Sequence, residues 1–314
     1  MNNSIVPQLG PVLMGTLVTN CGLETVACYT NYLEQHISKQ GKISSQLANF
    51  WASPALTDAH YWILENQVGK SWLRIIEDAN AEPAKPLRNT GWQSLEVCVS
   101  NVDVLGDKLQ NSPFKIIGPP ANLDVSDKIR AMQVIGLAGE VLYLTEIKSQ
   151  VPPFELPTAQ CAVDSLFIPV LCCHDRDKSL ALYESIATNQ GLSFETKITV
   201  INNEYGYDLG RAHPVATLQL ADHTLIEIDQ IAAAKQRPRI NGAPPTGIAI
   251  VSFGVDDLDA LNTQLTYLTT NQSESPYEGK RSACLRGHAG ELIELIEKKS
   301  HQPLENLRET KNEI

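Results

Sequence analysis

The chain has 314 residues, of which 43% are hydrophobic, and this is enough for one large or two medium globular domains. It carries 25 basic and 36 acidic residues, for a formal net charge of −11, and no run of Lys or Arg exceeds two residues. This pattern excludes the basic footprint of a nucleic-acid-binding protein, and no apolar stretch approaches the roughly 18 residues that cross a bilayer. We therefore expect neither nucleic acid nor a membrane as a partner.

The cysteines and the N-terminal segment indicate the cellular compartment in which the protein is expected. Seven cysteines are scattered along the chain, and none has the C-x-x-C spacing of a zinc or redox motif. The N-terminal segment does not have the form of a secretory signal. An odd number of isolated thiols fits a reducing environment, so we expect free, mostly buried cysteines and a cytoplasmic protein.

An apolar strand that leads into an amphipathic helix occurs four times along the chain. The four segments are 12–33, 94–109, 166–186 and 248–265. In the third segment, one helical face is approximated, after a cap at Asp175 or Asp177, by Leu180, Leu182, Tyr183 and Ile186. The spacing predicts helices near 23–37, 102–110, 177–189 and 256–268.

Each of these segments is followed, much later, by a short apolar strand. The four strands are WLRIIE (72–77), VLYLTE (141–146), LIEIDQ (225–230) and LIELIE (292–297), and two further strand candidates precede each of them. We predict final strands near 71–77, 140–146, 223–229 and 291–297. The simplest account is an α+β fold of four βαβββ modules.

Proline-rich connectors separate the copies. They lie at 79–91, 148–160 and 237–247. The middle connector predicts two domains, with modules 1 and 2 paired in residues 1–150. Modules 3 and 4 would pair in residues 151–314, followed by a polar C-terminal tail.

The second and fourth copies resemble modules of the vicinal oxygen chelate superfamily, which includes glyoxalases, bleomycin resistance proteins and extradiol dioxygenases. The residues that carry the resemblance are VDDLDAL (255–261), RGHAGELIELIE (286–297), SNVDVL (100–105) and GLAGEVLYLTE (136–146). The resemblance implies curved sheets whose concave faces form cups for small molecules. It implies a lyase, isomerase or dioxygenase that acts on a small oxygenated organic molecule.

Strand alternation predicts which side chains enter the cups. In LIELIE, Ile293 and Leu295 suit the helix side, so Glu294 faces the cup, and Glu227 does so in the third copy. A carboxylate between apolar neighbours is costly to bury without a partner. We take Glu294 as the candidate catalytic residue at the centre of a cup in the second half, assisted by Glu227 as general acid or base. The alternative is that each carboxylate is solvated or bonded to Arg or Lys.

Three residues of the first half suggest a polar, metal-free binding cup. These are Arg74, Tyr143 and Glu96, and Arg suits a carboxylate or phosphate group on a ligand. The alternative is an internal Arg–Glu pair that supports the structure.

The resemblance also raises the question of a metal. In metal-dependent relatives the position of Glu294 is a metal ligand, joined by histidines of the first strands. The corresponding first-strand positions here are Met14, Ser94, Ile168 and Ile250. We therefore expect a degraded metal site, with Glu294 as its remaining candidate ligand, and a divalent metal stays open as a cofactor.

Two further features of the sequence bear on its chemistry. Cys172 and Cys173 precede His174, which leaves a Cys–His nucleophile open. No glycine-rich phosphate loop is present, so no nucleotide cofactor is expected. Two functions remain: an enzyme of the glyoxalase or dioxygenase type, or a metal-free protein that binds or sequesters a small molecule. A homodimer is left open.

Overall fold

The computed structural model describes residues 8–123, 126–237, 242–261, 263–269, 272–273 and 275–298. The first module contains β1 (Leu9–Thr19), α1 (Gly22–Tyr32), β2 (His36–Lys42), α2 (Ser45–Phe50), a short 3-10 helix (Pro54–Leu56), β3 (His60–Glu65) and β4 (Ser71–Glu77). The second contains β5 (Gly91–Val99), α3 (Val102–Leu109), β6 (Lys115–Leu123), β7 (Ser126–Ile135) and β8 (Val141–Ile147).

The third module contains β9 (Val163–Cys173), α4 (Arg176–Ala187), β10 (Leu192–Lys197), α5 (Thr199–Tyr205), β11 (Ala212–Gln219) and β12 (Leu225–Gln230). The fourth contains β13 (Gly247–Val255), β14 (Thr266–Tyr267), β15 (Ser282–Arg286) and β16 (Leu292–Glu297). The α+β fold of four repeated modules is confirmed, and the final strands begin and end within two residues of their predicted bounds.

The helix predicted at 256–268 is wrong. The described residues of this range form turns and the two-residue strand β14. Leu258 is nevertheless buried, and Leu261 and Leu265 pack against the core. The segment is rich in Asp, Asn and Thr, which have low helix propensity, and its leucines reach the sheet without a regular helix.

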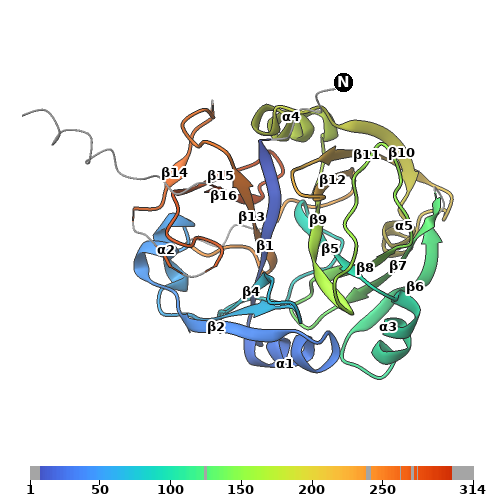
Figure 1. Ribbon diagram of the computed structural model, residues 1–314, viewed down its shortest axis with the longest axis horizontal. Helices are drawn as coiled ribbons and strands as arrows, with labels where there is room; N and C mark the ends of the chain where they lie inside the picture. Colours follow the sequence, from blue (N-terminus) through green and yellow to red (C-terminus); the bar gives the residue numbers. More distant parts are fainter. Residues whose placement is uncertain are drawn as a thin grey trace, which may run out of the picture.

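The modules are arranged in two curved eight-stranded sheets that lie side by side (Figure 1). The first sheet has the order β14-β15-β16-β13-β1-β4-β3-β2, and the second has the order β10-β11-β12-β9-β5-β8-β7-β6. The first sheet therefore joins modules 1 and 4 through β1 and β13, and the second joins modules 2 and 3 through β5 and β9.

This strand order corrects the predicted pairing of module 1 with 2 and of module 3 with 4. The connectors after β4 and after β12 both cross between the sheets, whereas the connector after β8 stays within the second sheet. The boundary near residue 150 therefore lies inside one sheet. The proline content of the connectors shows where they lie in the sequence. All four first strands are apolar, however, so the sequence does not specify which two of them pair side by side in one sheet.

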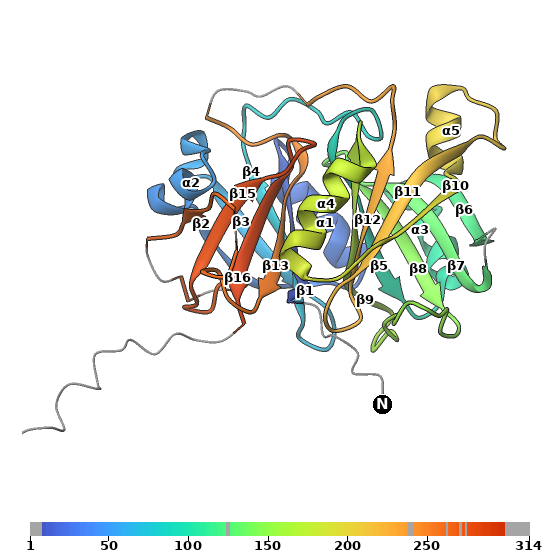
Figure 2. The same cartoon turned by 90° about the horizontal axis from the view of Figure 1, so that it is seen from above.

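The largest core lies where the central strands of the two sheets pack against each other, flanked by α1, α3 and α4 (Figure 2). Gly15 of β1 allows a close approach there, because a Cβ at this position would lie 2.8 Å from Cδ1 of Leu95 on β5.

Two helices begin at residues whose side chains cap them. Asn101 accepts a hydrogen bond from the Val104 amide, and Asp175 accepts one from the Lys178 amide. Among the described residues, no helix has the length and apolar character required to cross a membrane.

Candidate functional site

The strand register identifies the residues that face the middle of each cup. In the first sheet, Thr16 of β1 lies beside Arg74 of β4, and Ser252 of β13 lies beside Glu294 of β16. In the second sheet, the equivalent neighbours are Glu96 beside Tyr143, and Val170 beside Glu227. Counting from the strand end had predicted first-strand positions two residues earlier, at Met14, Ser94, Ile168 and Ile250.

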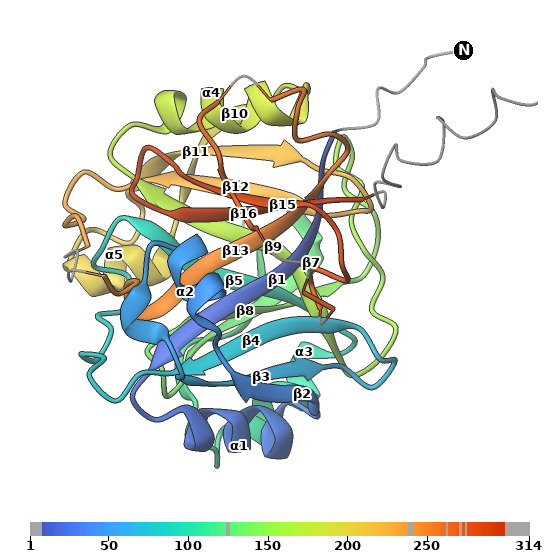
Figure 3. The ribbon, with the colours of Figure 1, turned by 90° about the vertical axis from the view of Figure 1, so that its left-hand side faces the viewer.

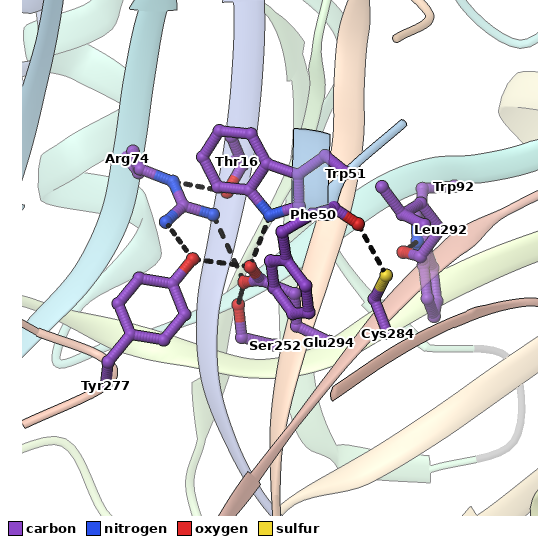
Figure 4. Close-up of polar contacts among 10 residues, drawn as sticks. All are labelled: Thr16, Phe50, Trp51, Arg74, Trp92, Ser252, Tyr277, Cys284, Leu292 and Glu294. Carbon is purple, nitrogen blue, oxygen red and sulfur yellow. Dashed lines mark hydrogen bonds and ion pairs between the residues drawn. The ribbon is translucent and has the colours of Figure 1, made fainter. Parts of the chain in front are cut away.

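Glu294 lies at the centre of the first cup, where it is 0% exposed and accepts four hydrogen bonds (Figure 4). Oε1 accepts from Trp51 Nε1 and from the Tyr277 hydroxyl, each at 2.5 Å. Oε2 accepts from Ser252 Oγ at 2.5 Å and from the Arg74 guanidinium at 3.1 Å. All four donors belong to the first sheet or to segments that pack on it.

Arg74 completes this cluster. Its side chain is 2% exposed, and it donates to Thr16 Oγ1 at 3.1 Å and to the Tyr277 hydroxyl at 3.0 Å. The guanidinium also lies over the Trp51 ring, 4.5 Å from its centroid. Burial alone would lower the pKa of Arg74, but Tyr277 and Glu294 raise it, so the guanidinium stays protonated in this cluster.

The first cup is filled by its own chain. Helix α2 lies across the concave face of the sheet (Figure 3), and Phe50 and Trp51 pack with Tyr277 against the inner residues of β1, β13 and β16. Cys284 of β15 donates to the Phe50 carbonyl at 2.9 Å, which ties the end of α2 to the sheet. The inner face of the first sheet is therefore a packed core around one ion pair.

The second cup carries a different set of groups. Glu96, Tyr143 and Glu227 are half-buried on its inner face, and Asp229, two residues beyond Glu227 on the same side of β12, is 1% exposed. Thr145 donates to Glu96 Oε1 at 2.7 Å. Among the residues that the structure describes, none of the three carboxylates forms an ion pair with Arg or Lys.

Burial without a cation raises the pKa of each carboxyl group. Burial and the nearby Glu227 raise the pKa of Glu96 to about 8, and burial raises the pKa of Glu227 to about 7. Burial and the neighbouring Glu227 raise the pKa of Asp229 well above its usual value. Near neutral pH this cup therefore holds both protonated and ionised carboxyl groups.

Apolar side chains pack on the concave face at both ends of the row formed by Glu96, Glu227 and Asp229. At one end, Val200 and Ile201 of α5 pack with Val141 and Cys172. At the other end, Leu156, from the segment after β8, packs with Ile168. The acidic groups occupy the middle of the concave face, between these two apolar clusters.

The structure brings together some of the predicted site residues and separates others. Arg74 pairs with Glu294, which confirms the alternative that this carboxylate is bonded to Arg. Glu96, Tyr143 and Glu227 share the second cup. Glu227 and Glu294, predicted to act together, lie in different sheets, because modules 3 and 4 do not pair.

Several important residues were not predicted. Trp51 and Tyr277 come from segments outside the repeat, so strand alternation cannot place them. Asp229 could have been found, because it follows Glu227 by two residues in LIEIDQ and must share its face.

The Cys–His pair has little support as a nucleophile. Cys172 is 0% exposed, burial raises its pKa, and burial raises the pKa of Cys173 to about 11. His174 bonds instead to the Ala234 carbonyl at 2.7 Å. Buried thiols of high pKa are poor nucleophiles.

The residues present do not fit the metal centre that the fold suggests. In the first cup, one of the four central positions is the cation Arg74, and Glu294 is already saturated by donors. Among the described residues, no group of three or more His, Cys, Asp or Glu side chains is placed to hold a metal ion. The four first strands contain no histidine.

Comparisons with known proteins agree with this architecture. No family model and no curated protein matches the sequence. The fold is similar to glyoxalase I from Zea mays, at 13% identity and a TM-score of 0.59, over 93% of each chain. It is also similar to a putative dioxygenase from Bacillus subtilis subsp. subtilis str. 168, at 12% identity and a TM-score of 0.61, over 95% of this chain and 87% of that chain. The chain therefore has the vicinal oxygen chelate fold, with four modules in one polypeptide.

Proposed function

We propose that the chain acts on a small oxygenated organic molecule at the inner face of the second sheet, and that it does so by proton transfer between that molecule and two carboxyl groups. The observation that carries the proposal is that Glu96 and Glu227 share one concave face, have raised pKa values and form no ion pair with a cation of the described residues. Carboxyl groups with pKa values close to the working pH are suited to general acid–base catalysis.

The two groups would have complementary roles. Glu96, with a pKa of about 8, is mainly protonated at neutral pH and can donate a hydrogen bond to a carbonyl or hydroxyl oxygen of the ligand. Glu227, with a pKa of about 7, is partly ionised and can accept a proton from carbon or oxygen. The Tyr143 hydroxyl, beside Glu96, would orient the ligand. The fold likeness to a glyoxalase I and to a putative dioxygenase supports the class of ligand.

Glu294, predicted from the sequence as the catalytic centre, is assigned a structural role in this proposal. It is sealed from solvent by Trp51 and Tyr277, and its two oxygens already accept four hydrogen bonds. A base in this state has no free lone pair directed at a ligand, and no space beside it for one.

A metal-free binding protein is the second candidate function. The three carboxyl groups of the second cup have no cationic partner among the described residues, and a ligand rich in hydrogen-bond donors would satisfy them without any reaction. Turnover separates the two candidates, because both predict that ligand affinity depends on this cup.

The test begins with a thermal-shift screen of 2-oxo acids, hydroxyketones, catechols and thiol adducts. For each ligand found, exchange of its acidic C–H protons is followed by NMR in D2O. Glu227→Gln should slow exchange by at least about a hundredfold while the ligand still binds. Glu195→Gln, an exposed change of the same kind on β10, is the matched control. Exchange that survives Glu227→Gln and Glu96→Gln would refute the proposal, and binding without exchange in the unmodified protein would favour the binder.

We also propose a cytoplasmic location, which is supported by the seven free cysteines. The homodimer stays a prediction that sedimentation can check. One chain supplies all eight strands of each sheet, so neither cup requires a second copy.

A further inference from the structure

A cleft of about 800 Å³ lies where the two connectors that cross between the sheets run together. One wall is the connector after β4, from Glu82 to Asn89, and the other is the start of the connector after β12, from Ala233 to Arg237. Both connectors run along the upper edge of the molecule in Figure 2. The floor is formed by the beginning of β5 and of β13, outside both cups.

The charge of this cleft is opposite to that of the protein. Four cationic side chains and one carboxylate line it, whereas the whole chain has a net charge of −11. The cations are Lys85, Arg88, Lys235 and Arg237. Arg88 is paired with Glu204, but Lys85 and Lys235 form no ion pair with any described residue. The cleft therefore has an uncompensated positive charge.

Arg237 is bound to the backbone at three points. Its guanidinium donates to the carbonyls of Thr246 at 3.3 Å, of Ile248 at 2.7 Å and of Trp92, and these contacts hold it between β5 and β13. Burial lowers the pKa of Arg237 to about 10, and it has no carboxylate partner in the described part of the chain. A half-buried guanidinium without a counter-ion is costly, and an anion in the cleft would offset that cost.

Gln93 provides a second and independent sign of a ligand. Its side chain is 5% exposed, it lines the same cleft, and its Nε2 donor has no hydrogen-bond partner. Buried amide donors are nearly always satisfied in folded proteins. An acceptor atom bound in the cleft would satisfy this one.

We infer that this cleft binds a small organic anion, with a carboxylate or phosphate group held by Lys85, Lys235, Arg237 and Gln93. The remaining wall is apolar, with Pro83, Pro86 and Pro245, so the ligand would carry an uncharged body beside its anionic group. The volume is in the range of sites for small organic molecules. This site is independent of the proposed function, because Glu96 and Glu227 do not line it.

Isothermal titration calorimetry with three probes tests the inference: phenyl phosphate, benzoate and the neutral phenol. We expect phenyl phosphate or benzoate to bind and phenol not to bind, and the two anions show which head group the cleft prefers. Lys85→Gln/Lys235→Gln should weaken binding by about tenfold, since two unpaired surface charges are lost. Gln93→Leu should weaken binding as well, because it removes the buried donor.

The matched control is Lys115→Gln/Lys178→Gln, which removes two exposed lysines elsewhere. Glu227→Gln should leave anion binding unchanged, so failure of the proposed function and failure of this inference can be distinguished. The inference is overturned if neither anion binds, if phenol binds as tightly as the anions, or if the two double-lysine variants weaken binding equally.

Discussion

Tyr29 donates a hydrogen bond of 2.8 Å to Glu140 and thereby joins α1 of the first module to the turn before β8 of the second. The same relationship recurs in the other half of the chain, where Tyr183 of α4 donates to Glu291, in the turn before β16, at 3.0 Å. Each pair crosses from one sheet to the other. The helix of one module thus holds the final hairpin of the next, although the two modules belong to different sheets.

These two pairs should make stability depend on pH. Burial raises the pKa of Glu140 and of Glu291 to about 7, from an ordinary value of 4.5. The folded state then binds more protons than the unfolded state between these two values. The free energy of unfolding should therefore be highest below about pH 4.5 for this contribution and should fall as pH rises through about 7. Urea denaturation over this range measures the effect.

The double variant Glu140→Gln/Glu291→Gln isolates the contribution of these pairs. Gln keeps the acceptor for each tyrosine but does not titrate, so the fall in stability with pH should become shallower. Some slope should remain, because Glu96 and Glu227 also have raised pKa values. An unchanged slope in the double variant, with the exposed Glu195→Gln as control, would contradict the prediction.

The repeat was predictable because each final strand combines alternating apolar residues with a turn just before it. β16 was predicted at 291–297 and is observed at Leu292–Glu297. Pairing between modules was not predictable, because β1 and β13 are both apolar on both faces and any two first strands satisfy the same pattern. The segment 256–268 shows a related limit, since leucines spaced three or four residues apart can also pack from an irregular loop.

The site was predictable only in part. Alternation placed Glu294, Glu227, Arg74 and Tyr143 on inner faces, and the structure agrees. It could not show that Trp51 would fill the first cup, because the position of α2 depends on tertiary packing rather than on the repeat. Strand alternation identifies the face of a residue, but the segment opposite that face decides whether the residue is open or sealed.

Gly15 should be sensitive to substitution because the two sheets meet there. A Cβ on residue 15 would lie 2.8 Å from Leu95 Cδ1 and 3.5 Å from Leu166 Cδ2. Gly15→Ala should lower the free energy of unfolding by about 1–3 kcal/mol through overpacking. Leu95→Val would relieve the crowding, so the double variant should be less destabilised than the sum of the two single variants. If the two effects on the free energy of unfolding simply add in denaturant titrations, crowding against Leu95 is not the cause of the destabilisation.

Thiol reactivity should follow burial. Cys21 and Cys161 are half-buried, and the other five cysteines are buried. In the native protein, a disulfide-exchange reagent should modify Cys21 and Cys161 first, and Cys172 should react only after unfolding because burial raises its pKa. Mass spectrometry of briefly labelled protein identifies the sites. Rapid labelling of Cys172 would restore the nucleophile hypothesis.

The buried pair of Arg74 and Glu294 should support folding rather than ligand binding. Arg74→Met leaves Glu294 buried and without its cation, which should cost about 3–5 kcal/mol of unfolding free energy. Removing both charges in Arg74→Met/Glu294→Leu should cost less than the sum of the two single variants, because no uncompensated charge remains. Thermal and denaturant unfolding of the four proteins measure the coupling.

A further variant, Glu294→Gln, separates structure from function at this ion pair. Glu294→Gln keeps nearly the same volume, but it removes the charge and directs an amide donor toward either the Trp51–Tyr277 side or the Arg74–Ser252 side. Every side of Glu294 faces a donor, so either orientation places donor against donor and should lower stability. Any ligand of the second cup should still bind to the folded variant with unchanged affinity. Loss of binding in Glu294→Gln at a temperature where the variant remains folded would instead return the functional centre to Glu294, where the sequence alone had placed it.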